Sequence, residues 1–239
     1  MPCSRFNIMA QTAAVPSRIV VADGTLEALK WLALILMTLD HVNTYLFERA
    51  LPGAFQAGRL AMPLFSFVIA YNLARPDALQ RGLVGRTMTR LAFFGLLATP
   101  FYIGLGKLAH GWWPLNIMFT FLVAAGTISL LQRGGAANVV AAAVLFLVGG
   151  ALVDYSWFGL FFFLAAWWYC KAPGNLPLAF LLFAAALLYV INQNFWALAA
   201  MPIILSALRL RLSAPRIRYA FYLYYPMHLG VLLILSRYV

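Results

Sequence analysis

Apolar runs of about 16 to 20 residues recur from Leu26 to the C-terminus, and one such run is long enough for a helix to cross a bilayer. Short segments that carry most of the charges separate these runs. Several runs are short enough to predict nearly perpendicular or bent crossings. The runs predict helices at residues 27–47, 57–74, 89–108, 115–132, 137–153, 156–170, 177–192, 195–210 and 218–236. We therefore expect an all-α fold, a polytopic transmembrane bundle of about nine spans.

The basic residues favour one orientation of this bundle. If the N-terminus is cytoplasmic, the cytoplasmic loops hold many arginines and lysines and the external loops few, as in proteins of the bacterial inner membrane. We expect a short, retained cytoplasmic tail at residues 1–25 and a single transmembrane domain at residues 26–239. The cytoplasmic set is Arg75, Arg81, Arg86, Arg90, Arg133, Lys171, Arg209, Arg211, Arg216 and Arg218, and the external set is Arg49, Arg59, Lys107 and Arg237.

Composition excludes several classes of protein. The chain is 64% hydrophobic and 10% charged, whereas soluble domains average roughly 25% charged residues. Its net charge of +11 sits in short loops, so the lipid bilayer explains it better than nucleic acid does. Cys3 and Cys170 lie far apart and form no ligand set, so we expect neither a disulfide nor a metal site. Soluble hydrolase, nucleotide-binding and zinc motifs are absent from the sequence.

Asp40 and His41 are ionisable residues inside the first predicted span. Such a residue costs several kilocalories per mole in a membrane and therefore needs a partner, water or a task. Asp40 is interpreted either as an ion-pair partner of Arg59 that pins two helices or as part of a polar site. His41 is either a packing residue or, beside a carboxylate, a general base.

Counting the predicted spans from the cytoplasm brings polar residues together at the external face. Asp40, His41, Arg59 and Asn116 share that level. The turns that hold Asp154 and residues 192–194 also reach it, and we interpret both as solvated loops. His110, beside two tryptophans, is interpreted as a solvated interfacial residue.

The last predicted span contains a proline among phenols and an imidazole. Pro226 removes one backbone hydrogen bond within the helix. Tyr222, Tyr225 and His228 follow one another at intervals of three residues and form a polar stripe. An aromatic-rich helix with a proline kink can simply pack, but this combination favours a site.

Four segments in order resemble the TraX family of conjugative-plasmid membrane proteins, and the short form resembles its TrbP branch. The segments are residues 29–41 with Asp40 and His41, residues 58–65, residues 116–120, and residues 224–228. The resemblance extends from about residue 26 to residue 236. It implies a relation to multi-span membrane acyltransferases and N-terminal acetylation of processed pilin, with acetyl-CoA as co-substrate.

The resemblance also implies roles for the matching residues. His41 would deprotonate the pilin amine or briefly carry the acetyl group, and Asp40 would orient it. Arg59 and Asn116 would stabilise the oxyanion. His228 and Tyr225 would act as a second acid or line the acyl channel, together with Tyr222. Four arginines would attract the CoA phosphates, although membrane topology also explains them: Arg86, Arg90, Arg216 and Arg218.

Two other classes of function remain open. A non-enzymatic scaffold or chaperone would hold pilin subunits in the inner membrane, and Asp40 and Arg59 would serve only to stabilise its fold as an ion pair. A small proton-coupled transporter would use the intramembrane aspartate and histidine as a relay. The sequence shows no inverted repeat, which counts against a transporter.

Overall fold

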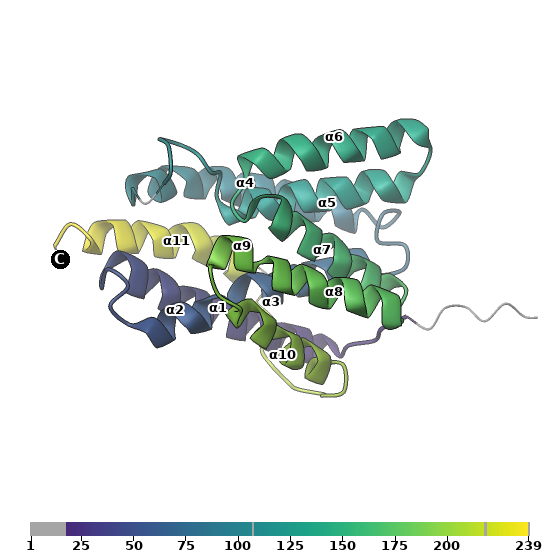
Figure 1. The fold of residues 1–239 in the computed structure, drawn as a ribbon, viewed down its shortest axis with the longest axis horizontal. Coiled ribbons are helices and arrows are strands. Elements are labelled where there is room, and N and C mark those ends of the chain that lie inside the picture. Colours follow the sequence, from purple (N-terminus) through teal and green to yellow (C-terminus); the bar gives the residue numbers. More distant parts are fainter. Residues whose placement is uncertain (1–17, 107, 218, 239) are drawn as a thin grey trace, which may run out of the picture.

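The computed structural model describes residues 18–106, 108–217 and 219–238, and these residues form helices without any strand. The long helices lie side by side along one axis (Figure 1). In chain order they are α1 (Asp23–Tyr45), α2 (Pro52–Gly58), α3 (Ala61–Leu73), α4 (Leu83–Gly104), α5 (Ile117–Arg133), α6 (Ala136–Leu152), α7 (Ser156–Lys171), α8 (Asn175–Leu187), α9 (Tyr189–Asn192), the 3-10 helix η1 (Trp196–Ala199), α10 (Ala200–Ala207) and α11 (Ala220–Leu235).

The all-α prediction is confirmed for the described residues. Each of the nine predicted stretches coincides with one helix or with two consecutive helices, as α2 and α3 do for residues 57–74. Within the described ranges, Pro52–Leu73 and Asn175–Asn192 are long and apolar enough to cross a membrane. The other apolar helices of this kind are shorter, so a nine-span membrane topology stays a prediction.

The first helix begins four residues before its predicted start at residue 27. It starts at Asp23, so Thr25 lies inside the first turn and is not its N-cap. The Thr25 hydroxyl donates to the carbonyl of Leu210 (2.9 Å) and accepts from the N–H of Leu212 (3.0 Å). The threonine therefore fastens the segment after α10 to the start of α1.

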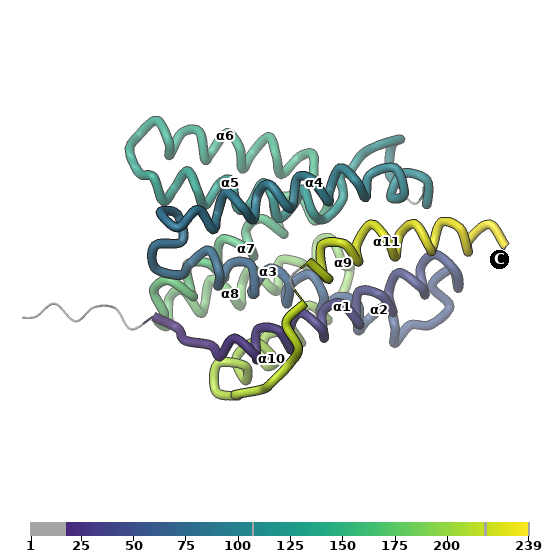
Figure 2. The backbone as a smooth tube through the Cα atoms, turned by 180° about the vertical axis from the view of Figure 1, so that it is seen from behind, coloured from purple at the N-terminus to yellow at the C-terminus, as the bar shows by residue number. Residues whose placement is uncertain are grey.

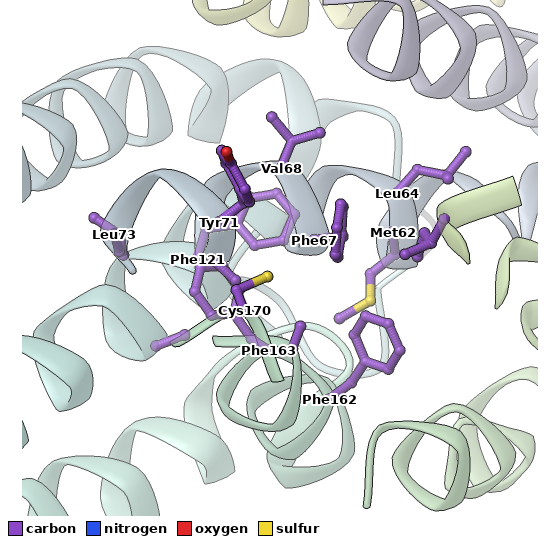
Figure 3. Close-up of a cluster of buried hydrophobic side chains, with 14 of the residues drawn as sticks. Met62, Leu64, Phe67, Val68, Tyr71, Leu73, Phe121, Phe162, Phe163 and Cys170 are labelled. Atoms are coloured by element: carbon purple, nitrogen blue, oxygen red, sulfur yellow. The ribbon is translucent and has the colours of Figure 1, made fainter. Parts of the chain in front are cut away.

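Aromatic side chains from α3, α5 and α7 fill the core (Figure 3). Phe67, Phe162 and Phe163 are almost completely buried, and Phe121 packs on Phe163 with ring centroids 6.0 Å apart. This cluster holds α3 against α7.

Basic residues gather at one end of the bundle, which we call the basic end. The α3–α4, α5–α6 and α7–α8 connections lie there (Figure 2). Arg75 pairs with Asp23 at 2.5 Å, and Gln132 donates to the carbonyl of Leu73 at 3.1 Å, so the start of α1 and the ends of α3 and α5 meet. The basic end comprises Arg75, Arg81, Arg86, Arg133, Lys171, Arg209 and Arg211. The opposite end holds Tyr45, Arg49, Asp154 and Asn192.

Candidate functional site

A cavity of about 340 Å³ runs through the bundle between α1, α3, α4, α5 and α11. Toward the basic end, its walls include Lys30, Asn72 and Tyr222, and at the opposite end they include Tyr45 and Asp154. Lys30 and Tyr45 belong to one helix and are separated by about 22 Å at 1.5 Å per residue. The cavity therefore extends along the bundle from the level of Lys30 to that of Tyr45, and its volume lies within the range of small-molecule sites.

Two histidines from different helices meet beside this cavity. Nδ1 of His41 lies 2.7 Å from Nε2 of His228, and the two rings are nearly parallel. Nδ1 of His228 lies 3.0 Å from the carbonyl oxygen of Tyr224. A carbonyl only accepts, so His228 carries its proton on Nδ1, and its Nε2 accepts from Nδ1–H of His41. In this neutral pair, Nε2 of His41 keeps a lone pair.

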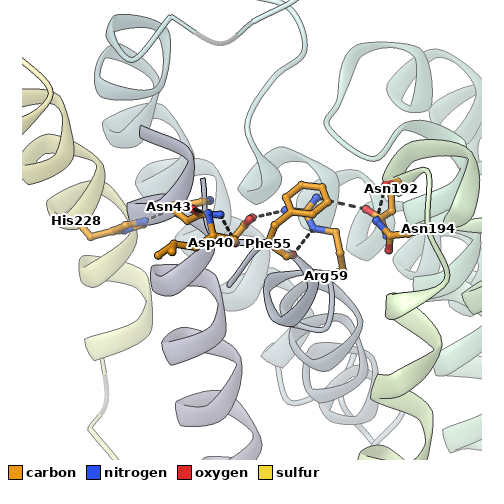
Figure 4. A network of polar contacts seen from close by, with 9 residues as sticks. Asp40, Asn43, Phe55, Arg59, Asn192, Asn194 and His228 are labelled. Carbon is orange, nitrogen blue, oxygen red and sulfur yellow. Dashed lines mark hydrogen bonds and ion pairs between the residues drawn. The ribbon is translucent and has the colours of Figure 1, made fainter. Parts of the chain in front are cut away.

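Asp40 and Arg59 form an ion pair between α1 and the residue after α2. The guanidinium of Arg59 also donates to the carbonyl of Phe55 (3.3 Å) and to the side-chain oxygen of Asn192 (3.5 Å) (Figure 4). It stacks over the Phe55 ring, 4.4 Å from the centroid. Among the described residues, the second carboxylate oxygen of Asp40 is buried without a hydrogen-bond partner. Such an oxygen is expensive to bury and marks a functional position.

A tight turn brings Arg59 to Asp40. The side chain of Asn43 accepts from the N–H of Leu51 and donates to its carbonyl, both at 2.9 Å, so the chain folds back after α1. Gly58 then packs directly on the aspartate, because a Cβ at this position would lie 2.3 Å from the Cβ of Asp40. The ion pair therefore depends on a small residue just before the arginine.

The structure brings most of the predicted site residues together. Asp40, His41, Arg59, Tyr222 and Tyr225 line the cavity. His228 is not among the residues that line the cavity, but it is hydrogen-bonded to His41, which does line it. The carboxylate of Asp40 pairs with Arg59, so the role of orienting His41, which we expected of Asp40, belongs to His228.

Asn116 differs from the expectation. It is the N-cap of α5, where its side-chain oxygen accepts from the N–H of Met118 at 3.1 Å. Its amide donates to the carbonyl of Gly95 (3.0 Å) and to the hydroxyl of Thr99 (3.3 Å). The side chain is buried and used within the fold, so we assign it a structural role.

The two turns that we interpreted as solvated loops are partly built into the site. Asn192 is 4% exposed and accepts from Arg59, which corrects that interpretation. Asp154 is half-buried and lines the cavity. It lies in the turn between α6 and α7, and burial raises its pKa to about 6, although the N–H of Tyr155 and the charge of Arg59 oppose this.

Four ionisable cavity residues escaped the sequence analysis: Lys30, Tyr45, Tyr102 and Tyr155. The tyrosines lie at helix ends, where a sequence pattern predicts an interfacial belt and not a cavity wall. Lys30 lies 2.6 Å from Glu27 and above the Phe221 ring at 4.8 Å. A lysine inside the first predicted span was the available signal for it.

The predicted CoA-binding arginines occupy different surroundings. Arg90 is half-buried above the rings of Tyr219 and Tyr222, beside the cavity. Arg86 and Arg216 are exposed, and Arg216 lies 3.8 Å from Glu27. Arg218 lies outside the described residues.

Comparison with known proteins identifies relatives over most of the chain. The family model described as TraX protein matches residues 25–236. A Protein TraX of Escherichia coli is 32% identical over 141 residues, 59% of this chain and 54% of that protein. The Protein TraX of Escherichia coli strain K12 is 29% identical over 152 residues, 63% and 58% of the two chains.

A third relative covers more of both chains. The Probable fimbrial assembly protein FimC, serogroup H1, of Dichelobacter nodosus is 27% identical over 241 residues, 88% of this chain and 95% of that protein. The chain therefore spans little more than half the length of the two TraX relatives and nearly all of the fimbrial one. No solved structure matches the chain.

Proposed function

The chain belongs to the TraX family, and from this premise we propose that it is a membrane-embedded acetyltransferase that N-acetylates processed conjugative pilin. The observation that carries the proposal is the cavity that extends along the bundle from Lys30 past His41 to Asp154. The two substrates, cytoplasmic acetyl-CoA and a pilin N-terminus outside, require access from opposite ends.

The names of the relatives support a pilin acceptor. The name of the Dichelobacter nodosus relative refers to fimbrial assembly, and the alignment covers 95% of that protein. The resemblance to TraX proteins implies a conjugative pilin. An inner-membrane enzyme of pilus biogenesis meets pilin subunits before they assemble.

The surface of the bundle supports a membrane location. Large apolar side chains face outward along the helices, among them Val140, Leu147 and Phe183, which are 63%, 60% and 57% exposed. Extended exposed apolar surface of this kind marks contact with a membrane or a partner. With the basic end in the cytoplasm, the charge distribution obeys the positive-inside rule, and the N-terminus is cytoplasmic.

The residues at the inner end of the cavity suit acetyl-CoA. Lys30 places an ammonium group on the cavity wall, and Arg90 lies against Tyr222 at the same end. Cations at this position can bind the CoA phosphates. Lys30 and His41 line the same cavity, so the linear arm that carries the acetyl group can extend from one to the other.

The chemistry needs a base and a site for negative charge. Acetyl-CoA supplies an acetyl group activated as a thioester. As the amine nitrogen bonds to the acetyl carbon, Nε2 of His41 accepts the proton that the amine loses, and His228 holds the ring and stabilises the charge that it gains. The C–S bond of the thioester then breaks, and the departing CoA sulfur takes this proton from His41, so that CoA leaves as the thiol. Arg59, fixed by Asp40 and Phe55, offers a cation to the carbonyl oxygen as negative charge develops there.

Mass spectrometry of mature pilin tests this function. Cells that carry the intact protein are compared with cells that carry His41→Ala, and immunoblotting of membranes checks that both proteins are equally abundant. We expect the N-acetyl mass on pilin only with the intact protein. Unmodified pilin in both strains would exclude pilin acetylation.

A scaffold that holds pilin is the second candidate, favoured by the ion pair that ties Asp40 to Arg59. Asp40→Asn separates the two functions. A scaffold predicts lower abundance of the variant and loss of pilus assembly even where pilin carries no acetyl group. An acetyltransferase predicts a variant that is still present in the membrane while pilin acetylation is lost.

A further inference from the structure

Asp154 stands at the outer end of the cavity among three tyrosines. Tyr45 ends α1, Tyr102 belongs to the last turn of α4, and Tyr155 follows the aspartate in the turn before α7. All four residues line the cavity, and the phenols lie within electrostatic range of the carboxylate. The helices α1, α4 and α7 thus contribute to one chamber.

The backbone around Asp154 is held in place from several sides. Its N–H donates to the carbonyl of Leu115 at 2.8 Å, and its carbonyl accepts from the hydroxyl of Thr120 at 2.6 Å. Tyr155 and Ser156 adopt φ values of 59° and 47°, in the left-handed region that non-glycine residues rarely occupy. Strained backbone of this kind persists where the surroundings impose it, typically at functional sites.

The carboxylate keeps an acceptor for a ligand. One oxygen of Asp154 accepts from the N–H of Tyr155 at 2.9 Å. Within the described ranges, no lysine or arginine forms an ion pair with it, since Arg59 pairs with Asp40. A carboxylate bordered by aromatic rings is the combination that attracts an ammonium group, by charge and by cation–π contact.

We infer that Asp154, with Tyr45, Tyr102 and Tyr155, forms the binding site for the primary ammonium group of the acceptor. This inference rests on the proposed function, because it names where the acceptor of that reaction is held. The Tyr45 ring lies 5.9 Å from the His41 ring, so an amine bound in the chamber is adjacent to the base. The arrangement selects a cationic amine over a neutral hydroxyl acceptor.

A binding measurement tests the site without any acetyl transfer. The full chain, purified in lipid nanodiscs, is titrated with tetra-alanine amide that carries either a free or an acetylated N-terminus, and binding is followed by calorimetry. We expect the free amine to bind more tightly than the acetylated peptide. Asp154→Asn should weaken binding of the free amine roughly tenfold to a hundredfold, as for a hydrogen bond to a charged group.

Two variants of Tyr102 test the role of the aromatic ring, and one control variant tests whether the loss of a carboxylate elsewhere affects binding. Tyr102→Leu should weaken binding and Tyr102→Phe should preserve it, because only leucine removes the aromatic face. Asp77→Asn is the matched control, since Asp77 is exposed near the basic end, and asparagine tolerates its positive φ of 57°.

Equal binding of both peptides, or unchanged binding by Asp154→Asn, would overturn the site. Selective amine binding without any pilin acetylation would refute only the proposed function.

Discussion

At the scale of single residues, the free nitrogen of His41 owes its state to two hydrogen bonds. The carbonyl of Tyr224 fixes the proton of His228, and His228 in turn fixes the proton of His41. The proposed base is thereby held in one tautomer by an imidazole, a task that a carboxylate performs in hydrolase triads. Asp40 is one residue away, about 100° around the helix, where it meets Arg59.

This chain of hydrogen bonds predicts different effects at the two histidines. His41→Ala removes the base and should lower kcat by about 10²–10⁴-fold. His228→Ala removes only its positioning partner and should lower kcat less, with KM for the acceptor peptide unchanged. His228→Asn should restore part of the rate, because its side-chain oxygen can accept from His41. An equal loss in all three variants would contradict the positioning role.

The carboxyl of Asp154 predicts how acceptor binding depends on pH. Its pKa of about 6 exceeds the ordinary value of 3.8 because of burial, so the group becomes neutral as pH falls through 6. The peptide ammonium stays charged at these pH values. We therefore expect the highest affinity near pH 7 and declining affinity below pH 6. Affinity should also fall above about pH 8, where the α-amino group of the peptide loses its proton. The titration is repeated with Asp154→Asn, which should show a flat profile below pH 6; a parallel decline would assign the effect to another group.

Comparing the pH profiles of the intact protein and Asp154→Asn also controls for the other charged and phenolic groups around Asp154. The charges that face it are those of Arg59, Asp40 and Arg49, and the phenols are those of Tyr45, Tyr102, Tyr155 and Tyr225. The variant retains all of them. A difference between the two profiles therefore reports the aspartate itself.

At the scale of helices, the short α2 positions the ion pair. It folds back on α1 after the turn closed by Asn43, and Gly58 brings the two backbones close enough for Arg59 to reach Asp40. Arg59 therefore reaches the site because the residue before it, Gly58, is small.

Two glycine substitutions within α2 test this packing. Gly58→Ala places a methyl group 2.3 Å from the Cβ of Asp40 and should destabilise the fold by roughly 1–3 kcal/mol, as overpacking does. Gly53→Ala is the matched control, because a Cβ there meets nothing within 4 Å. Thermal unfolding in detergent should show a lower Tm for Gly58→Ala only. Equal Tm values in the two variants would contradict the close contact.

The helices themselves could be predicted from hydrophobic runs, because each run must become a helix to satisfy its backbone in an apolar setting. Their subdivision could not. The stretch at residues 57–74 reads as one element, but regular helix is interrupted at Arg59 and Leu60, between α2 and α3, where Arg59 makes its contacts. The role of Asn116 could not be predicted either, because an asparagine at this position suits both a helix N-cap and an oxyanion donor.

At the scale of the whole molecule, counting alternate spans correctly placed the polar residues of distant segments at one level. Asp40, Arg59 and Asn192 meet there as ion-pair and hydrogen-bond partners. The count could not reveal the cavity that continues from this level toward Lys30, because cavity walls depend on which apolar side chains face inward. The pairing of His41 with His228 likewise depends on how α1 and α11 are rotated.

Transfer across a sealed bilayer is the most direct test of the proposal that the cavity gives the two substrates access from opposite ends. The purified chain is reconstituted in liposomes that enclose a pilin peptide, radiolabelled acetyl-CoA is added outside, and only molecules with the basic end outward meet it. Labelled peptide should accumulate inside with the intact protein and not with His41→Gln, at equal reconstituted amounts. No labelled peptide with the intact protein, or equal labelling with the variant, would contradict acetyl transfer through this cavity by His41.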